Sequence, residues 1–149
     1  MTNFGDIAKD VMTARKNFGA PESMKLKESI DSKDMVGKTI TIDEVIVINR
    51  VKYDKETKEV IKAKDGSDIY QAIAYIAFDG DKFFASKSAI LIEQLETFSG
   101  TKLTAKEKKD FTVNKIAGES VTISNEKVKY RDGKMYDQII FKWNNLFGN

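Results

Sequence analysis

The order of strand and helix patterns constrains the fold of this chain more than any other feature of its sequence. From Gly37 onward, several stretches are rich in β-branched residues or alternate apolar with polar residues, which is typical of β-strands. One stretch, Ala89–Phe98, instead repeats apolar residues at helical spacing. Three strand patterns precede this helix and others follow it. The order favours a mainly β fold with a helix inserted after its third strand.

The three patterns before the helix are well bounded. Thr39–Ile48 is β-branched with a polar interruption at residues 43–44, so we expect one long strand with a bend or bulge. Ser67–Phe78 predicts a second strand, and residues 82–85 predict a short third one. Residues 79–81, Asp-Gly-Asp, are typical of a tight turn. The second and third strands should therefore form a hairpin.

After the helix, strand patterns return at Glu119–Asn125 and Met135–Trp143. A further apolar stretch, Phe111–Ile116, is either an added strand or part of a longer connection. Strand, strand, strand, helix, strand, strand is the order of a five-stranded OB barrel, whose helix lies between the third and fourth strands. We therefore predict an all-β fold with one or two helices, built as a five-stranded OB-fold-like barrel.

Residues 1–36 differ from the β-rich remainder. Apolar residues recur at helical spacing between Asp6 and Lys16, so this stretch predicts a short amphipathic helix. We divide the chain into an N-terminal arm or short helix, residues 1–36, and an OB-fold domain, residues 37–149. The arm is either mobile, or a helix that docks on the domain or on a second copy of the chain.

The absence of two residue types narrows the function. The 149-residue chain contains no cysteine and no histidine, so a disulfide framework, a Ser-His-Asp relay and an ordinary zinc site all lack their essential groups. We therefore expect a binding protein rather than an enzyme, with no cofactor. No apolar run approaches the roughly 20 residues of a membrane span. With 41% apolar residues available for a core, the sequence predicts one soluble, cytoplasmic domain.

Positive charge gathers in the two loops that follow the first and the fourth predicted strands. The whole chain has a net charge of only +2. From Arg50 to Lys64, however, six Lys or Arg residues face three acids, and from Glu126 to Lys134 four face two. In an OB barrel these loops flank the ligand face. Basic loops with aromatic residues suit a phosphate backbone with exposed bases.

The candidate nucleic-acid-binding residues come mainly from these loops. Cations would neutralise phosphates, and flat side chains would stack on bases, which contributes about 1–3 kcal/mol per base whatever its identity. The candidate cations are Arg50, Lys52, Lys58, Lys62, Lys64, Lys127, Lys129, Arg131 and Lys134. The candidate stacking residues are Tyr53 and Tyr130 in the loops and Tyr75 on the second strand.

The remaining large aromatic residues are expected to pack inside. A small barrel needs bulky interior side chains, so we assign to the core Tyr70, Phe78, Phe83, Phe84 and Trp143. Tyr75 shares the more polar face of its strand with Gln71. Two interpretations of Tyr75 therefore stay open, an outward stacking ring or a buried one.

One enzyme hypothesis rests on three residues. Asp43, Glu56 and Lys58 are the residue types of a carboxylate–carboxylate–lysine nuclease site, which holds Mg²⁺ through oxygen ligands and activates water. Glu56 and Lys58 lie in a very polar run rather than on a rigid strand, which counts against this hypothesis. We therefore expect no catalytic residues and no metal.

With these residues placed, the chain resembles a bacteriophage single-stranded-DNA-binding protein of the compact OB-fold type. The resemblance rests on Gly37–Ile42, on Tyr75–Ser88 and on the helix that follows, and it extends as a pattern over about residues 37–143. It implies non-sequence-specific binding and protection of single-stranded DNA during viral DNA replication or recombination, without catalysis.

The same resemblance implies a set of partners. These are single-stranded DNA, with RNA left open, further copies of the chain, and replication or recombination proteins in the host cytoplasm, but no membrane. The alternative is a non-enzymatic structural or adaptor β-barrel that binds a protein partner, because small barrels serve both purposes.

Overall fold

The computed structural model describes residues 17, 19–54 and 56–143. The helix expected between Asp6 and Lys16, and Lys55 of the first basic loop, lie outside these residues. The described strands are β1 (Glu28–Ser29), β2 (Thr39–Val51), β3 (Tyr70–Phe78), β4 (Lys82–Ser86), β5 (Lys109–Thr112), β6 (Ser120–Lys129) and β7 (Met135–Trp143). The helices are α2 (Ala89–Ser99) and the 3₁₀ helices η1 (Glu22–Met24), η2 (Ser32–Met35) and η3 (Asn114–Ile116).

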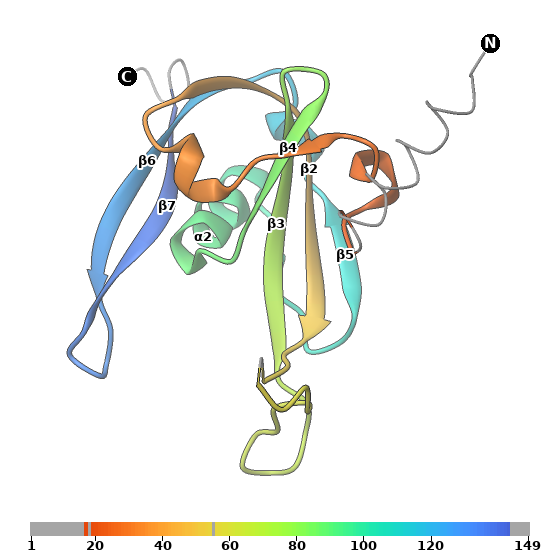
Figure 1. Cartoon of the computed structure of the whole chain (residues 1–149), viewed down its shortest axis with the longest axis vertical. Helices are drawn as coiled ribbons and strands as arrows, with labels where there is room; N and C mark the ends of the chain where they lie inside the picture. The colour runs from red at the N-terminus through yellow and green to blue at the C-terminus, as the bar shows by residue number, and fades with distance from the viewer. Residues whose placement is uncertain (1–16, 18, 55, 144–149) are drawn as a thin grey trace.

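The strands form a strongly curled sheet with β2 at its centre (Figure 1). The order is β1-β4-β3-β2-β6-β7, and β5 pairs with β2 beside that path. β2 pairs with β3 along residues 42–51, and it also pairs with β6 at residues 39–41 and with β5 at residues 46–49. One long strand thus joins the two halves of the sheet.

β2 bends at the polar interruption in its sequence. Its pairing register with β3 shifts between Ile42 and Glu44, which is a β-bulge. The Asp43 carboxylate accepts a hydrogen bond from the Gly80 amide at 2.7 Å and so links the bulge to the β3–β4 turn. The predicted irregularity is confirmed. Because a bulge bends and twists its strand, the first residues of β2 can turn toward β6.

The mainly β architecture is confirmed, but the number of strands differs from the prediction. The described residues form a seven-stranded sheet rather than a five-stranded one. The additional strands are the two-residue β1 and the four-residue β5. The ambiguous stretch Phe111–Ile116 divides into the end of β5 and η3. Such short strands are defined by pairing with a neighbour rather than by a long alternating pattern. The sequence pattern therefore missed β1, and it indicated β5 only through the alternative of an added strand at Phe111–Ile116.

α2 lies beside β7 and β3, and it is tied to β7 by side-chain hydrogen bonds (Figure 1). Ser88 caps the helix by accepting from the Leu91 amide, and its hydroxyl donates to the Ile139 carbonyl. The Gln94 amide group accepts from the Phe141 amide and donates to its carbonyl, both at 2.9 Å. Side chains of the helix and of its N-cap therefore occupy the edge of β7 that no strand covers within the described residues.

The main core fills the concave side of the sheet, under α2. It contains the apolar face of the helix together with residues of β2, β3, β4, β6 and β7. Of the aromatic residues predicted to pack inside, Phe78 and Phe84 are buried here, and Tyr70 is half-buried. Trp143 packs at the margin of this core, where its ring stacks on Phe98 with the centroids 5.1 Å apart.

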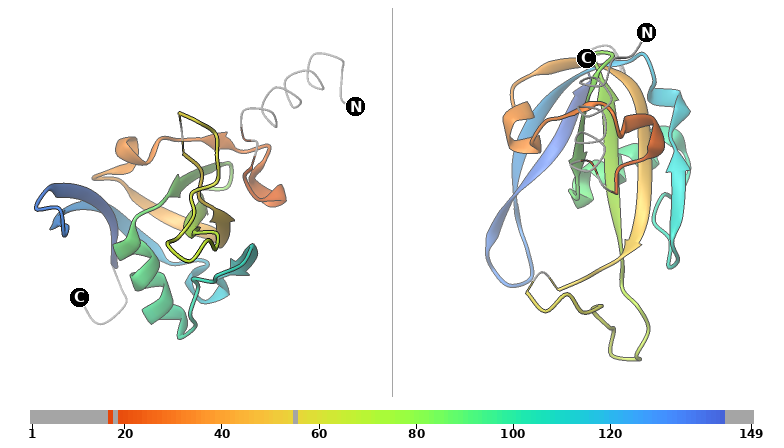
Figure 2. Two further views of the ribbon diagram at one scale, coloured as in Figure 1. Left: turned by 90° about the horizontal axis from the view of Figure 1, so that it is seen from below. Right: turned by 45° about the vertical axis from the view of Figure 1, so that its right-hand side comes forward.

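A second, smaller apolar cluster lies on the outer face of β2, β3 and β4. Residues 19–24 run beside this face (Figure 2), and Met24 of η1 is fully buried in the cluster, whereas Met35 of η2 belongs to the main core. Phe83 is buried in the same cluster, as predicted. β1 adds to the edge of β4 in parallel. The described part of the N-terminal segment is therefore docked on the β-domain, through η1, β1 and η2.

Candidate nucleic-acid interface

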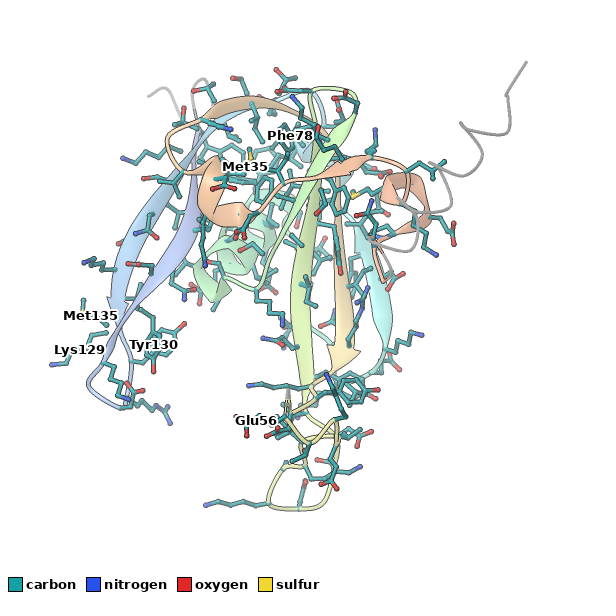
Figure 3. The ribbon with its side chains drawn as sticks, in the orientation of Figure 1. Met35, Glu56, Phe78, Lys129, Tyr130 and Met135 are labelled. Carbon is teal, nitrogen blue, oxygen red and sulfur yellow. The ribbon has the colours of Figure 1, made fainter. Side chains whose placement is uncertain are left out.

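Both basic loops project from the same end of the molecule. The β2–β3 loop, residues 52–69, and the tip of the β6–β7 hairpin, residues 130–134, lie at the end opposite the β3–β4 turn (Figure 1, Figure 2). Figure 3 shows Tyr130 on the side of the hairpin toward the β2–β3 loop, and Lys129 and Met135 on the other side. Among the described residues, no hydrogen bond or ion pair joins the two loops.

Acidic side chains in the β2–β3 loop are engaged by the loop itself. The Asp54 carboxylate accepts from the amides of Glu56 and Thr57, at 2.8 and 3.0 Å. These hydrogen bonds, with that from Thr57 the stronger influence, hold the pKa of Asp54 below its ordinary value of 3.8. Asp65 accepts from the hydroxyl and the amide of Ser67, which lowers its pKa in the same way. Both carboxylates therefore brace turns of the loop.

The β6–β7 hairpin is a regular antiparallel ladder in which residues 121–129 pair with residues 135–143. At its tip, the Asp132 carboxylate accepts from the Tyr136 hydroxyl at 2.7 Å and from the Lys134 amide at 2.8 Å. These two bonds lower the pKa of Asp132, and the first of them raises the pKa of Tyr136 above its ordinary value of 10.0. The hydrogen bond between the Asp132 carboxylate in the turn and the Tyr136 hydroxyl on β7 therefore helps to hold the tip in place.

Three tyrosines are exposed on or beside these loops, with Tyr136 on β7 next to the hairpin tip. The exposed fraction is 59% for Tyr53, 42% for Tyr130 and 39% for Tyr136. The rings of Tyr130 and Tyr136 lie with their centroids 4.7 Å apart and form one paired aromatic surface. Sequence analysis did not select Tyr136. The signal that could have found it is the alternation along β7, which places Tyr136 on the face opposite that of the buried Phe141.

The cations predicted to contact phosphate from the two loops are all exposed. They are Lys52, Lys58, Lys62, Lys64, Lys127, Lys129, Arg131 and Lys134. Lys127 and Lys129 lie on β6 rather than in a loop, because the strand extends to Lys129. Lys62 differs from the others because its ammonium pairs with Asp68 across the loop. Arg50 differs too, since it lies on β2 and is half-buried. Lys62 is therefore already paired with an acid, and Arg50 is less accessible to solvent than the other cations.

Tyr75 is not available for stacking. It lies on the outer face of β3, but residues of the N-terminal segment cover that face and leave only 7% of Tyr75 exposed. The guanidinium of Arg50 also lies over its ring, 5.6 Å from the centroid. The prediction of Tyr75 as a nucleic-acid-binding residue is wrong because it treated the outer face as bare.

The connection between α2 and β5 brings a third basic segment to the same region. Asn49 of β2, only 1% exposed, donates to the Leu103 carbonyl at 2.9 Å and accepts from the Ala105 amide at 3.1 Å. The next residue, Lys106, is close enough to Asp65 to contribute to lowering its pKa. A buried amide thus positions a lysine-bearing segment near the β2–β3 loop. The available signal was a polar side chain within the apolar run of β2.

The nuclease hypothesis is wrong in its geometry. Asp43 lies at the bulge of β2, beside the β3–β4 turn. Glu56 and Lys58 lie in the β2–β3 loop at the opposite end (Figure 3). These three residues therefore do not form one site. Within residues 17, 19–54 and 56–143, no group of three or more acidic side chains could hold a metal ion.

No family model matches the chain, and neither a curated protein nor a solved structure matches it. No helix in the described part of the chain is long and apolar enough to span a membrane. Function must therefore be inferred from the two loops and the surfaces beside them.

Proposed function

We propose that this chain binds single-stranded DNA without sequence preference and protects it during phage DNA replication or recombination. One observation carries the proposal: exposed tyrosines lie among exposed lysines on two loops that share one end of the molecule. The tyrosines are Tyr53 on one loop and the Tyr130–Tyr136 pair on the other.

The order of the elements supports an OB-like interpretation of the fold. Taking β2, β3, β4, β6 and β7 as the five barrel strands puts α2 between the third and the fourth. The loops after the first and the fourth of these strands are then the two basic loops. On this interpretation β1, β5 and the N-terminal segment are additions to the barrel.

Two physical effects would produce the binding. Loop lysines release condensed counterions from the strand when they contact its phosphates, so affinity falls as salt rises. Tyrosine rings replace base–base stacking and accept any base. Neither effect depends on the edges of the bases, so little sequence preference is expected. A single strand exposes both phosphates and base faces, whereas a duplex stacks its bases inside.

Fluorescence anisotropy of a labelled dT oligonucleotide, titrated with the protein at two salt concentrations, tests the proposal. We expect binding at low salt, weaker binding at high salt, and much weaker binding of a duplex of equal length. An RNA oligonucleotide of equal length shows whether the sugar matters, because stacking and phosphate contacts do not depend on it. An unchanged anisotropy at low salt would refute single-strand binding.

A structural or adaptor barrel is the second candidate. Met135, which points away from the β2–β3 loop, is 56% exposed, and exposed methionines suit contacts with proteins. Such a protein would bind its own copies or another protein without a steep dependence on salt. Self-association in sedimentation experiments without DNA, combined with no oligonucleotide binding, would favour this candidate over the first.

A further inference from the structure

A cavity of about 540 Å³ lies beside the outer face of β2, next to the β2–β3 loop. Ile48, Arg50 and Val51 of β2 line it, and Tyr53 lines it just beyond the end of that strand. Residues 19–22 of the N-terminal segment also line it, as do Lys108 and Asp110 around the start of β5. Pockets for small ligands commonly have volumes of about 300–1,000 Å³, so the size fits a ligand of this class.

Arg50 is the most informative group in this cavity. Its guanidinium lies over the ring of the buried Tyr75, which occupies one of its faces. Among the described residues, it pairs with no carboxylate. An arginine carries five N–H donors in a fixed fork that matches a phosphate, and here these donors border an open cavity.

Gly19 makes room for this guanidinium. A Cβ atom at position 19 would lie 2.8 Å from Nη1 of Arg50, closer than van der Waals contact permits. Gly19 also has a φ of +94°, a backbone conformation that glycine adopts without strain. The N-terminal segment therefore passes beside Arg50 without displacing it, and any side chain at position 19 would push the guanidinium away.

The other side chains of the cavity complete a set that fits a nucleotide. Lys108 is exposed and adds a second cation. Asp110 offers a carboxylate, an acceptor for an N–H group of a base, such as N3–H of thymine. The exposed ring of Tyr53 offers a stacking surface. Glu22, the remaining acid, is occupied because it pairs with Lys25 at 2.9 Å.

We propose that this cavity binds one nucleotide of the bound strand, with its phosphate on Arg50 and Lys108 and its base against Tyr53. The inference rests on the proposed single-strand binding and adds a specific site to it, between β2, β5 and the N-terminal segment. Cations, an acceptor and a ring together favour a nucleotide over an inorganic anion, which would use only the cations.

An NMR titration of the full chain tests the site directly. The Nε–H signal of Arg50, assigned by its loss in Arg50→Lys, and the amide signal of Gly19 are followed during the titration. A dT oligonucleotide, dTMP and inorganic phosphate are added to separate samples. We expect both signals to shift with the oligonucleotide and, at higher concentration, with dTMP, and to shift much less with phosphate.

Two glycine variants provide a matched comparison. Gly19→Ala should displace the guanidinium and weaken oligonucleotide binding about 3- to 10-fold, the size of one or two lost hydrogen bonds. Gly37→Ala is the control, because Gly37 has a similar φ of +90° but a Cβ there would meet nothing within 4 Å. Its affinity should match that of the unmodified protein. Circular dichroism of both variants shows whether the fold is retained.

The possible outcomes separate the cavity from the wider function. Oligonucleotide binding that leaves the Arg50 and Gly19 signals unmoved, with equal affinities for both alanine variants, would overturn the cavity and leave strand binding intact. No oligonucleotide binding, with dTMP still shifting Arg50, would support the nucleotide site and overturn strand binding. Equal shifts with phosphate and dTMP would overturn the nucleotide assignment. No shift with any ligand, together with no oligonucleotide binding by anisotropy, would overturn both proposals.

Discussion

The two basic loops carry similar residues on different frameworks. The β6–β7 hairpin is an antiparallel ladder up to the pair Lys129–Met135, and its tip is closed by Asp132. Among its described residues, the β2–β3 loop has two isolated bridges, at Tyr53–Val60 and Lys62–Asp68, and consists otherwise of turns and irregular backbone. One framework therefore holds its side chains through regular pairing, and the other holds them through local turns.

This difference suggests a division of roles. Stacking depends on the orientation of a ring, so it gains most from a framework that holds the ring in place before binding. The paired rings of Tyr130 and Tyr136 meet this condition. Attraction between lysines and phosphates acts over several ångströms and tolerates movement. We therefore expect the hairpin to contribute more to affinity and the β2–β3 loop more to its salt dependence.

Removing both hairpin tyrosines should have the largest effect on oligonucleotide affinity. We expect Tyr130→Ala combined with Tyr136→Ala to weaken binding of a dT oligonucleotide about 10- to 100-fold, because two stacking surfaces are lost. Anisotropy at fixed salt measures the loss. The double phenylalanine variant keeps both rings and should retain most of the affinity. A loss below about twofold for the alanine pair would show that the hairpin is not the stacking surface.

Removing the single tyrosine of the β2–β3 loop should have a smaller effect. Tyr53→Ala is expected to weaken binding about 3- to 10-fold, because the ring is 59% exposed and binding must order it first. The same titration measures the change, with Tyr53→Phe as the control. A loss larger than that of the hairpin pair would reverse the proposed roles of the two loops.

Much of this architecture was predictable because local pattern determines it. Alternation over Ser67–Phe78 and Met135–Trp143 anticipates β3 and β7, which occupy nearly these bounds. The polar interruption at residues 43–44 anticipates the bulge. Adjacent residues of a regular strand point to opposite faces, so two adjacent acids would place one of them on the apolar face. The charge of the loops is likewise visible in the sequence alone.

The features that sequence analysis missed depend on contacts between distant segments. Tyr75 is buried because the N-terminal segment, including Met24, covers its face, and residues 19–36 contain no periodic pattern that announces this docking. Arg50 and Lys108 line one cavity because β5 pairs with β2, a contact that no local pattern encodes. The candidate site is therefore less predictable than the fold.

Single lysine substitutions in the β2–β3 loop should change the salt dependence of oligonucleotide binding. Lys64 is exposed and has no ion pair among the described residues, whereas Lys62 pairs with Asp68. One phosphate contact on a single strand contributes about 0.7 to the slope of log affinity against log salt. We expect Lys64→Ala to reduce the slope by about this amount and Lys62→Ala to reduce it less. Equal reductions, measured by anisotropy across a salt series, would show that the ion pair opens on binding.

The smallest effects should come from titrating the acids that brace the two loops. Asp54 and Asp132 both have a pKa below 3.8 because their carboxylates accept hydrogen bonds in the folded chain. A lowered pKa means that the carboxylate stabilises its turn above the ordinary value and that this contribution is lost as the pH falls through the lowered value. Both turns should therefore be intact at about pH 5 and loosen in stronger acid, as the carboxyl ¹³C shifts would report.

Raising the pH into the alkaline range should instead affect the tip of the hairpin and not the turns of the β2–β3 loop. The pKa of Tyr136 is raised above 10.0 because its hydroxyl donates to Asp132, so this bond is fully present below pH 10 and is lost as the pH rises through the raised value. Asp54 is braced by amides and by Thr57, none of which titrates there. The carboxyl ¹³C signal of Asp132 should therefore shift above about pH 10 while that of Asp54 does not. Tyr136→Phe should abolish this alkaline step and leave a smaller acid one, because the Tyr136 hydroxyl is the main cause of the lowered pKa of Asp132 and the Lys134 amide is the second. Within the described residues, a titratable phenol holds the hairpin tip but not the turns of the β2–β3 loop. An alkaline shift of both carboxyl signals would therefore mean that the two loops do not differ in this way.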